Sequence, residues 1–119
     1  MEEEFLHFIW LYQLFDHNDL SSINGEVVQI IHSGIHNTNS GPDFSEARIL
    51  IGGNLWIGNV EIHVNTSDWF LHQHQFDAAY SNVILHVVYN HNAENWGIDQ
   101  PTYIPLLELK KRIDLHKYH

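Results

Sequence analysis

The pattern of apolar and polar positions predicts one helix followed by a series of strands. Apolar residues recur over 2–16 at the spacing of one helix face. Segments rich in Val and Ile predict strands at 26–32, 47–51, 55–64 and 82–89. A second helix is expected over 73–80 and a short edge strand over 105–109. We therefore expect an α/β (α+β) fold with a mixed β-sheet in the order α-β-β-β-α-β, as one domain spanning 1–119.

The strand at 55–64 changes character along its length. Side chains alternate between the two faces of a strand, which places Val60 and Ile62 on one face and Glu61 and His63 on the other. The second face begins with apolar residues and ends with polar ones. This change predicts a strand whose far end lines a cleft.

A third polar residue is expected at the same place. Asp43 lies at the entry to the strand at 47–51, and Gly52-Gly53-Asn54 predicts a tight turn that pairs this strand with the next as a hairpin. A hairpin would bring Asp43 near Glu61. Two adjacent carboxylates with a backbone carbonyl between them form a hard oxygen site suited to Mg²⁺ or Mn²⁺. Such an ion can activate water and stabilise charge on a phosphoryl oxygen.

This motif resembles the PD-(D/E)xK nuclease superfamily, through Pro42-Asp43 and Glu61-Ile62-His63 in the predicted element order. The resemblance implies a restriction-endonuclease-like fold, with metal bound by Asp43, Glu61 and the backbone carbonyl of Ile62. It also implies that Asp43, Glu61 and His63 are catalytic. His63 stands where that superfamily has a lysine, so a permanent positive charge is missing.

Longer strings resemble a bacterial family of unknown function, domain of unknown function 2851. They cover nearly the whole chain and include the following segments: 3–10, 36–44, 58–64, 68–74 and 84–89. The resemblance implies no activity. Members of that family are usually longer, so this chain is expected to be an N-terminal portion or a short member, and other segments of a longer chain are possible partners.

Histidine is unusually frequent, with eleven in 119 residues. His72 and His74 are two positions apart, and in extended backbone they would point the same way and could bind Zn²⁺ or another transition metal. His86 lies between apolar neighbours, where a hydrogen-bonded core histidine is the more common case. His7 is expected at the surface, and the glutamates at 2–4 are expected to be a solvated helix start. The resemblance to the nuclease superfamily also implies an alternative, since some of its members use an acid from the first helix, which Glu2, Glu3 or Glu4 could supply.

Charge and composition restrict the function classes. The formal net charge is −10, and Arg48 is the only Lys or Arg before residue 110. Tight binding to a nucleic-acid backbone requires several such cations, so nucleic acid is a weakly supported partner. The chain has no cysteine, no apolar run long enough to span a membrane, and an acidic start unlike a signal peptide. A cytoplasmic protein is expected.

Three functions remain open. The first is a Mg²⁺- or Mn²⁺-dependent nuclease-like phosphodiesterase domain, or a degenerate relative, built on Asp43, Glu61 and His63. The second is a non-catalytic acidic module that binds a partner. The third is a transition-metal site held by histidines.

Overall fold

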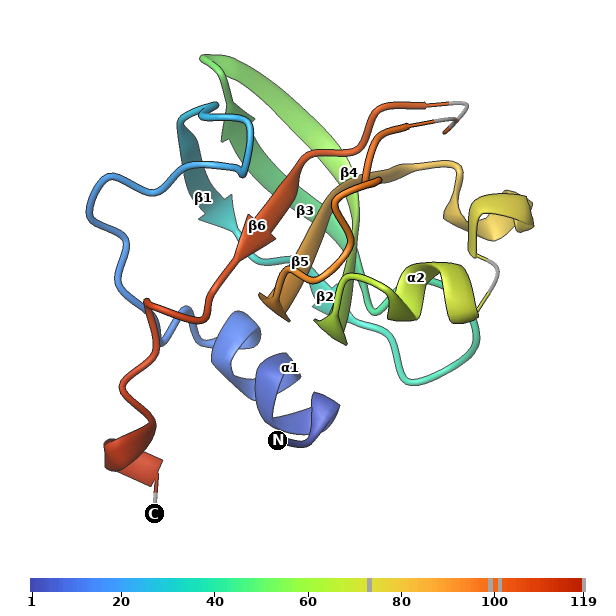
Figure 1. Cartoon of the computed structure of the whole chain (residues 1–119). Coiled ribbons are helices and arrows are strands. Elements are labelled where there is room, and N and C mark those ends of the chain that lie inside the picture. Colours follow the sequence, from blue (N-terminus) through green and yellow to red (C-terminus); the bar gives the residue numbers. More distant parts are fainter. Residues whose placement is uncertain (73, 99, 101, 119) are drawn as a thin grey trace.

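The computed structural model of the chain describes residues 1–72, 74–98, 100 and 102–118. It is a mixed α+β fold in which one curled sheet is flanked by short helices (Figure 1). The helices and strands run in the following order: α1 (Glu3–Leu11), β1 (Val28–His32), β2 (Ile35–His36), β3 (Phe44–Ile51), β4 (Asn54–Asn65), α2 (Asp68–Leu71), β5 (Val83–Asn90) and β6 (Leu106–Glu108).

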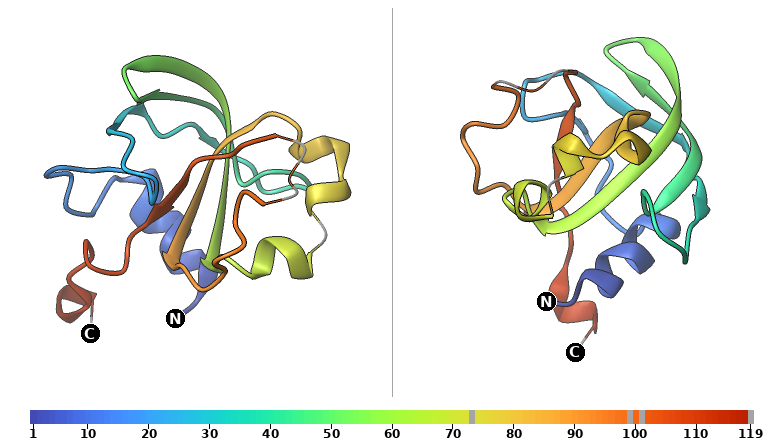
Figure 2. Two further views of the ribbon diagram at one scale, coloured as in Figure 1. Left: turned by 45° about the horizontal axis from the view of Figure 1, so that its top comes forward. Right: turned by 90° about the vertical axis from the view of Figure 1, so that its right-hand side faces the viewer.

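The sheet is antiparallel on one side and parallel on the other, as the expected mixed sheet requires. Its strand order is β1-β3-β4-β5-β6, and β2 pairs with β3. Pairing is antiparallel from β1 through β3 to β4, and parallel from β4 through β5 to β6. The long strand β4 therefore joins the two halves, and the sheet curls around it (Figure 2).

The hairpin predicted from Gly52-Gly53-Asn54 is confirmed. Ile51 pairs with Asn54, and the two glycines between them have φ values of +57° and +87°. Two consecutive positive φ values match the twist of a two-residue hairpin turn, and glycine adopts them without strain. The pairing continues to Phe44 opposite Val60, which leaves Asp43 beside Glu61.

Helix α1 is shorter than predicted because it ends in a hydrogen-bonded cap. Gln13 adopts a left-handed conformation with φ +54°. Its N–H donates to the carbonyl of Trp10, and the N–H of Leu14 donates to the carbonyl of Ile9. This pair of bonds is the Schellman arrangement that ends helices. Residues 12–16 are thus outside the helix.

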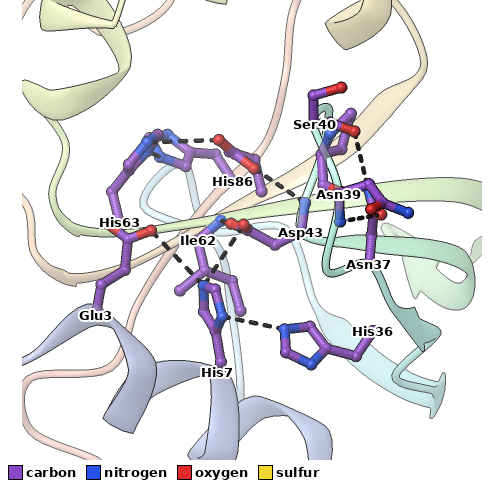
Figure 3. A network of polar contacts seen from close by, with 12 residues as sticks. Glu3, His7, His36, Asn37, Asn39, Ser40, Asp43, Ile62, His63 and His86 are labelled. Carbon is purple, nitrogen blue, oxygen red and sulfur yellow. Dashed lines mark hydrogen bonds and ion pairs between the residues drawn. The ribbon is translucent and has the colours of Figure 1, made fainter.

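The apolar face of α1 seals one end of the sheet. Leu6, Ile9 and Trp10 are fully buried against residues of β3, β4 and β5. The indole N–H of Trp10 donates to the Ser33 carbonyl over 2.9 Å. The adjoining flank of the helix N-terminus, which carries Glu3 and His7, is thereby aimed at Asp43, beside Ile62 of β4 (Figure 3).

The prediction of one continuous helix over 73–80 is wrong, and its first residue lies outside the described residues. Helix α2 lies before this segment. The segment itself contains two single 3₁₀ turns, His74–Phe76 and Ala78–Tyr80. Between them Asp77 is extended, and its carboxylate accepts the N–H of Ala79. A side chain that caps a new turn competes with continuing the previous one.

The element order differs from the predicted α-β-β-β-α-β by the additional short strand β2 and by the position of α2, which lies before the predicted helix. Strand β6, expected over 105–109, covers 106–108. Among the described residues, no helix combines the length and the apolar character needed to cross a bilayer.

Candidate metal centre

Asp43 and Glu61 hold each other in place through a reciprocal pair of hydrogen bonds. The N–H of Asp43 donates to Glu61 Oε1 over 3.1 Å. The N–H of Ile62 donates to Asp43 Oδ2 over 2.8 Å (Figure 3). Both acids follow from the hairpin register, since Asp43 precedes the first paired residue of β3. One oxygen of each carboxylate remains available, namely Asp43 Oδ1 and Glu61 Oε2.

The proximity of the two carboxyl groups has an electrostatic cost. Burial, together with the neighbouring Asp43 charge, raises the pKa of Glu61 to about 10. Burial also opposes ionisation of Asp43, but His7 and hydrogen bonds from its surroundings outweigh it, so the pKa of Asp43 is lowered. Two close carboxylates cannot both be ionised cheaply. A bound cation would allow both to carry charge.

His63 projects from the same face of β4 as Glu61, as strand alternation predicts. Its residue exposure is only 1%, and its Nε2 lies 3.5 Å from Glu61 Oε2. Its Nδ1 lies 2.8 Å from Nε2 of His86 on the parallel neighbour β5. Burial lowers the pKa of His63 to about 4. The imidazole is therefore neutral at pH 7, which is the form that binds metals.

His86 is a fully buried core residue, as its apolar neighbours suggest, and it contacts His63 directly. Its other nitrogen, Nδ1, has no hydrogen-bond partner among the described residues. Burial lowers the pKa of His86 well below its usual value. Its contact with Trp69, at 5.1 Å between ring centroids, ties it to α2.

Helix α2 reverses the chain direction after β4, and two histidines that follow it, His72 and His74, therefore lie next to His63. The carboxylate of Asp68 accepts the N–H of Asn65 as the chain leaves β4, and Trp69 is buried beneath the helix. His74 then stacks on His63 at 5.2 Å between ring centroids, and His72 meets the same ring edge-on at 5.2 Å. His72 is exposed, whereas the side chain of His74 is only 10% exposed.

Three nitrogen donors converge at this point, and a carboxylate oxygen lies beside two of them. One nitrogen from each of His63, His72 and His74 lies within 4.8 Å of the others. Glu61 Oε2 lies 2.9 Å from His74 Nε2, yet that nitrogen has no hydrogen bond of acceptable geometry among the described residues. Neighbouring ligands of a tetrahedral ion with bonds of about 2.1 Å are roughly 3.4 Å apart. The three imidazoles are thus close enough together that they could hold one transition-metal ion.

A second group lies next to the first and contains His7, which sequence reasoning had placed at the surface. His7 Nε2 lies 3.6 Å from Glu3 Oε1 and 3.5 Å from Asp43 Oδ1. Although burial lowers it, contacts with Asp43 and Glu3 raise the pKa of His7 to about 9. Glu3 and His7 are four residues apart, so they share a helix face. That spacing was the available signal, but only the packing of α1 shows that the face points at Asp43.

A hollow of about 360 Å³ adjoins the histidines. Its lining includes Trp69, His74, Tyr80, Thr102 and Ile104. The ring of Tyr80 stacks on His74 with centroids 3.9 Å apart. Because one wall of the hollow is a candidate ligand, a small molecule bound there would lie beside the ion.

The structure therefore brings Asp43, Glu61, Ile62, His63, His72 and His74 to one region. Whether these residues are ligands or catalytic groups stays a prediction. No curated protein and no solved structure matches the chain, and the resemblance to the nuclease superfamily finds no support in these comparisons. The model of the family described as "Protein of unknown function (DUF2851)" matches residues 3–119, so the chain belongs to that family.

Proposed function

We propose that this domain binds a divalent transition-metal ion, most simply Zn²⁺, and uses it for hydrolysis. His63, His72 and His74 supply nitrogen ligands, the fourth position is left for water, and Glu61 Oε2 lies beside the site. The observation that carries the proposal is the convergence of three imidazoles, with the Glu61 carboxylate next to two of them.

The surroundings of His63 support this proposal. A metal-binding histidine commonly has its second ring nitrogen held by a hydrogen bond, which orients the ring and selects its tautomer. His86 provides that bond to Nδ1 of His63 and leaves Nε2 aimed at Glu61. Nitrogen donors favour Zn²⁺ and similar ions over Mg²⁺.

The proposed chemistry is activation of water. A zinc-type ion lowers the pKa of bound water to near neutrality, provided that one position is left for it. The exposed His72 marks the solvent side of the site. Glu61, held by the Asp43 N–H, can accept a proton from such a water, and the hollow beside His74 is the proposed substrate position.

Calorimetric titration tests the binding step. We expect Zn²⁺ and Co²⁺ to bind untagged wild-type protein, and a His72→Ala/His74→Ala variant to lose at least tenfold in affinity. His17→Ala is the matched control, because it removes an exposed imidazole outside the cluster. Equal affinity of the double variant and wild type would refute the proposal.

A second candidate is a nuclease-like Mg²⁺ or Mn²⁺ site at Asp43 and Glu61, with the Ile62 carbonyl as a further ligand and His63 near the phosphate. The direct contact between Asp43 and Glu61 favours it. The net charge of −10 and the neutral state of His63 weigh against a phosphodiester substrate.

Cleavage assays separate the candidates. Cleavage of DNA or RNA with Mn²⁺ that is lost in Asp43→Asn would favour the nuclease-like function. Hydrolysis of small activated esters with Zn²⁺ would favour the first proposal. Retained ion binding with neither activity would favour a structural metal in an acidic interaction module, in which other segments of a longer chain are the partners.

A further inference from the structure

We infer that the domain holds a second divalent ion, bound by Glu3, His7 and Asp43 next to the histidine site. The inference rests on the proposed function, because it makes that site one half of a two-ion centre. The two halves meet at the Asp43–Glu61 pair, whose free oxygens face opposite groups.

The spacing of the second group fits ligands better than it fits hydrogen bonds. His7 Nε2 lies 3.6 Å and 3.5 Å from its two acidic neighbours. Both separations exceed the 2.7–3.2 Å usual for N–H···O bonds and are close to the roughly 3.4 Å between ligands of one small ion. This nitrogen is buried and has no hydrogen-bond partner among the described residues.

The two groups share a supporting arrangement. His7 Nδ1 lies 3.2 Å from Nε2 of His36 on β2, just as His63 Nδ1 lies 2.8 Å from Nε2 of His86. In each group the Nε2 atom of one histidine lies near an acid, and the Nδ1 atom of the same ring contacts a second histidine (Figure 3). An imidazole buttressed in this way is typical of metal ligands.

Charge and access also suit an ion at this place. Glu3 and Asp43 are two acids against one histidine, and an ion bound here would replace the proton that His7, with its pKa of about 9, carries in the metal-free protein. In the described part of the chain, no Lys or Arg is among the ion-pair partners of these three residues. The Glu3 side chain is 41% exposed, so solvent reaches this half of the centre. Three protein ligands leave positions for water or for an oxygen of the substrate. In two-ion centres the ions bind the attacking and leaving oxygens of phosphoryl or related esters, so an anionic ester is the substrate class we expect.

Metal stoichiometry tests the inference. Native mass spectrometry with Co²⁺ should show two ions per wild-type chain, and one in Glu3→Gln/His7→Ala. Glu4→Gln, which removes an exposed acid from the same helix turn, should keep two. The milder Glu3→Gln alone should weaken the second ion at least fivefold without altering the first, which guards against loss of folding in the double variant.

The outcomes distinguish the two proposals. One ion in wild type that persists in Glu3→Gln/His7→Ala and is lost in His72→Ala/His74→Ala overturns the second site but supports the first. One ion with the reverse dependence supports the Glu3 site and overturns the proposed function. With Mn²⁺, spin coupling between two bound ions, detected by electron paramagnetic resonance, is expected only where both groups are intact.

Discussion

The two halves of β4 differ in a way that reverses the usual relation between polarity and burial. Leu55 and Ile57 in its first half are 57% and 55% exposed. Glu61 and His63 in its second half are 3% and 1% exposed. Burial of polar groups costs free energy unless they gain partners, so the second half is the half that needs an explanation by function.

The neighbouring strands account for part of this difference. The first half pairs in the antiparallel hairpin with β3, where Ile57 lies opposite Arg48 on an outer face. The second half pairs in parallel with β5, whose central residues are buried on both faces, and is covered by α1 and α2. Buried carboxylates and imidazoles in such a covered region are characteristic of sites rather than of stabilising cores.

The largest expected effect contrasts two isoleucines of β4. Ile62 is fully buried in the core, and Ile62→Ala should lower the free energy of unfolding by about 2–5 kcal/mol through lost contacts and a cavity. Ile57→Ala, at an exposed position, should change it by less than about 0.5 kcal/mol. Urea denaturation of both variants measures the contrast, and comparable losses would remove the distinction between the two halves.

The second prediction concerns pH in the metal-free protein. The pKa of His63 is about 4 when folded and 6.5 when unfolded, so the unfolded chain binds more protons between these values. The contribution of His63 to stability is then fully present above pH 6.5 and is lost as the pH drops towards 4, by an amount on the order of 3 kcal/mol. His86 acts in the same direction. Glu61, whose pKa is raised to about 10, acts in the opposite direction over this range, so the effect of His63 is the difference between wild type and a variant that lacks it.

Denaturation with chelator present, at several pH values, tests this. The stability of a His63→Gln variant relative to wild type is expected to rise as the pH falls from 6.5 towards 4. A difference between variant and wild type that stayed constant from about pH 7 to about pH 4.5 would mean that folding does not lower the pKa of His63.

The third prediction concerns metal removal. Zn²⁺ at 100 times its dissociation constant should stabilise the folded protein by about 2.7 kcal/mol, and a chelator should reverse this. Glu61→Gln should leave the metal-free protein nearly unchanged, because the raised pKa keeps Glu61 protonated at pH 7. The variant should gain less from Zn²⁺ than wild type, as thermal unfolding would show; an equal gain would exclude a role for Glu61 beside the ion.

The smallest predicted effect on stability concerns the bulge in β3, which lies opposite the boundary between the two halves of β4. Its register with β4 shifts between Phe44 and Ala47, and Glu46 has a φ of +58° within this bulge. Glycine adopts such a conformation without the steric cost that other residues carry. Glu46→Gly should therefore raise the free energy of unfolding by about 0.5 kcal/mol, while Glu46→Val, which is strained there, should lower it.

The local parts of the candidate site could be predicted from the sequence. Strand alternation alone assigns Glu61 and His63 to one face, and the glycine pair sets the hairpin that delivers Asp43. His72 and His74 were recognised as a pair from their spacing. The turn chemistry at Asp77 was not recognised, and so the segment was expected to be one continuous helix.

By itself, the sequence determined the strand faces, the hairpin and a pairing of acids with a histidine, because these depend on backbone geometry over a few residues. Only the tertiary structure decided that His7 meets Asp43 and that His86 supports His63. Those contacts join residues 36 and 23 positions apart. They depend on how α1 packs on the sheet and on the parallel register of β5 beside β4, which no local pattern specifies.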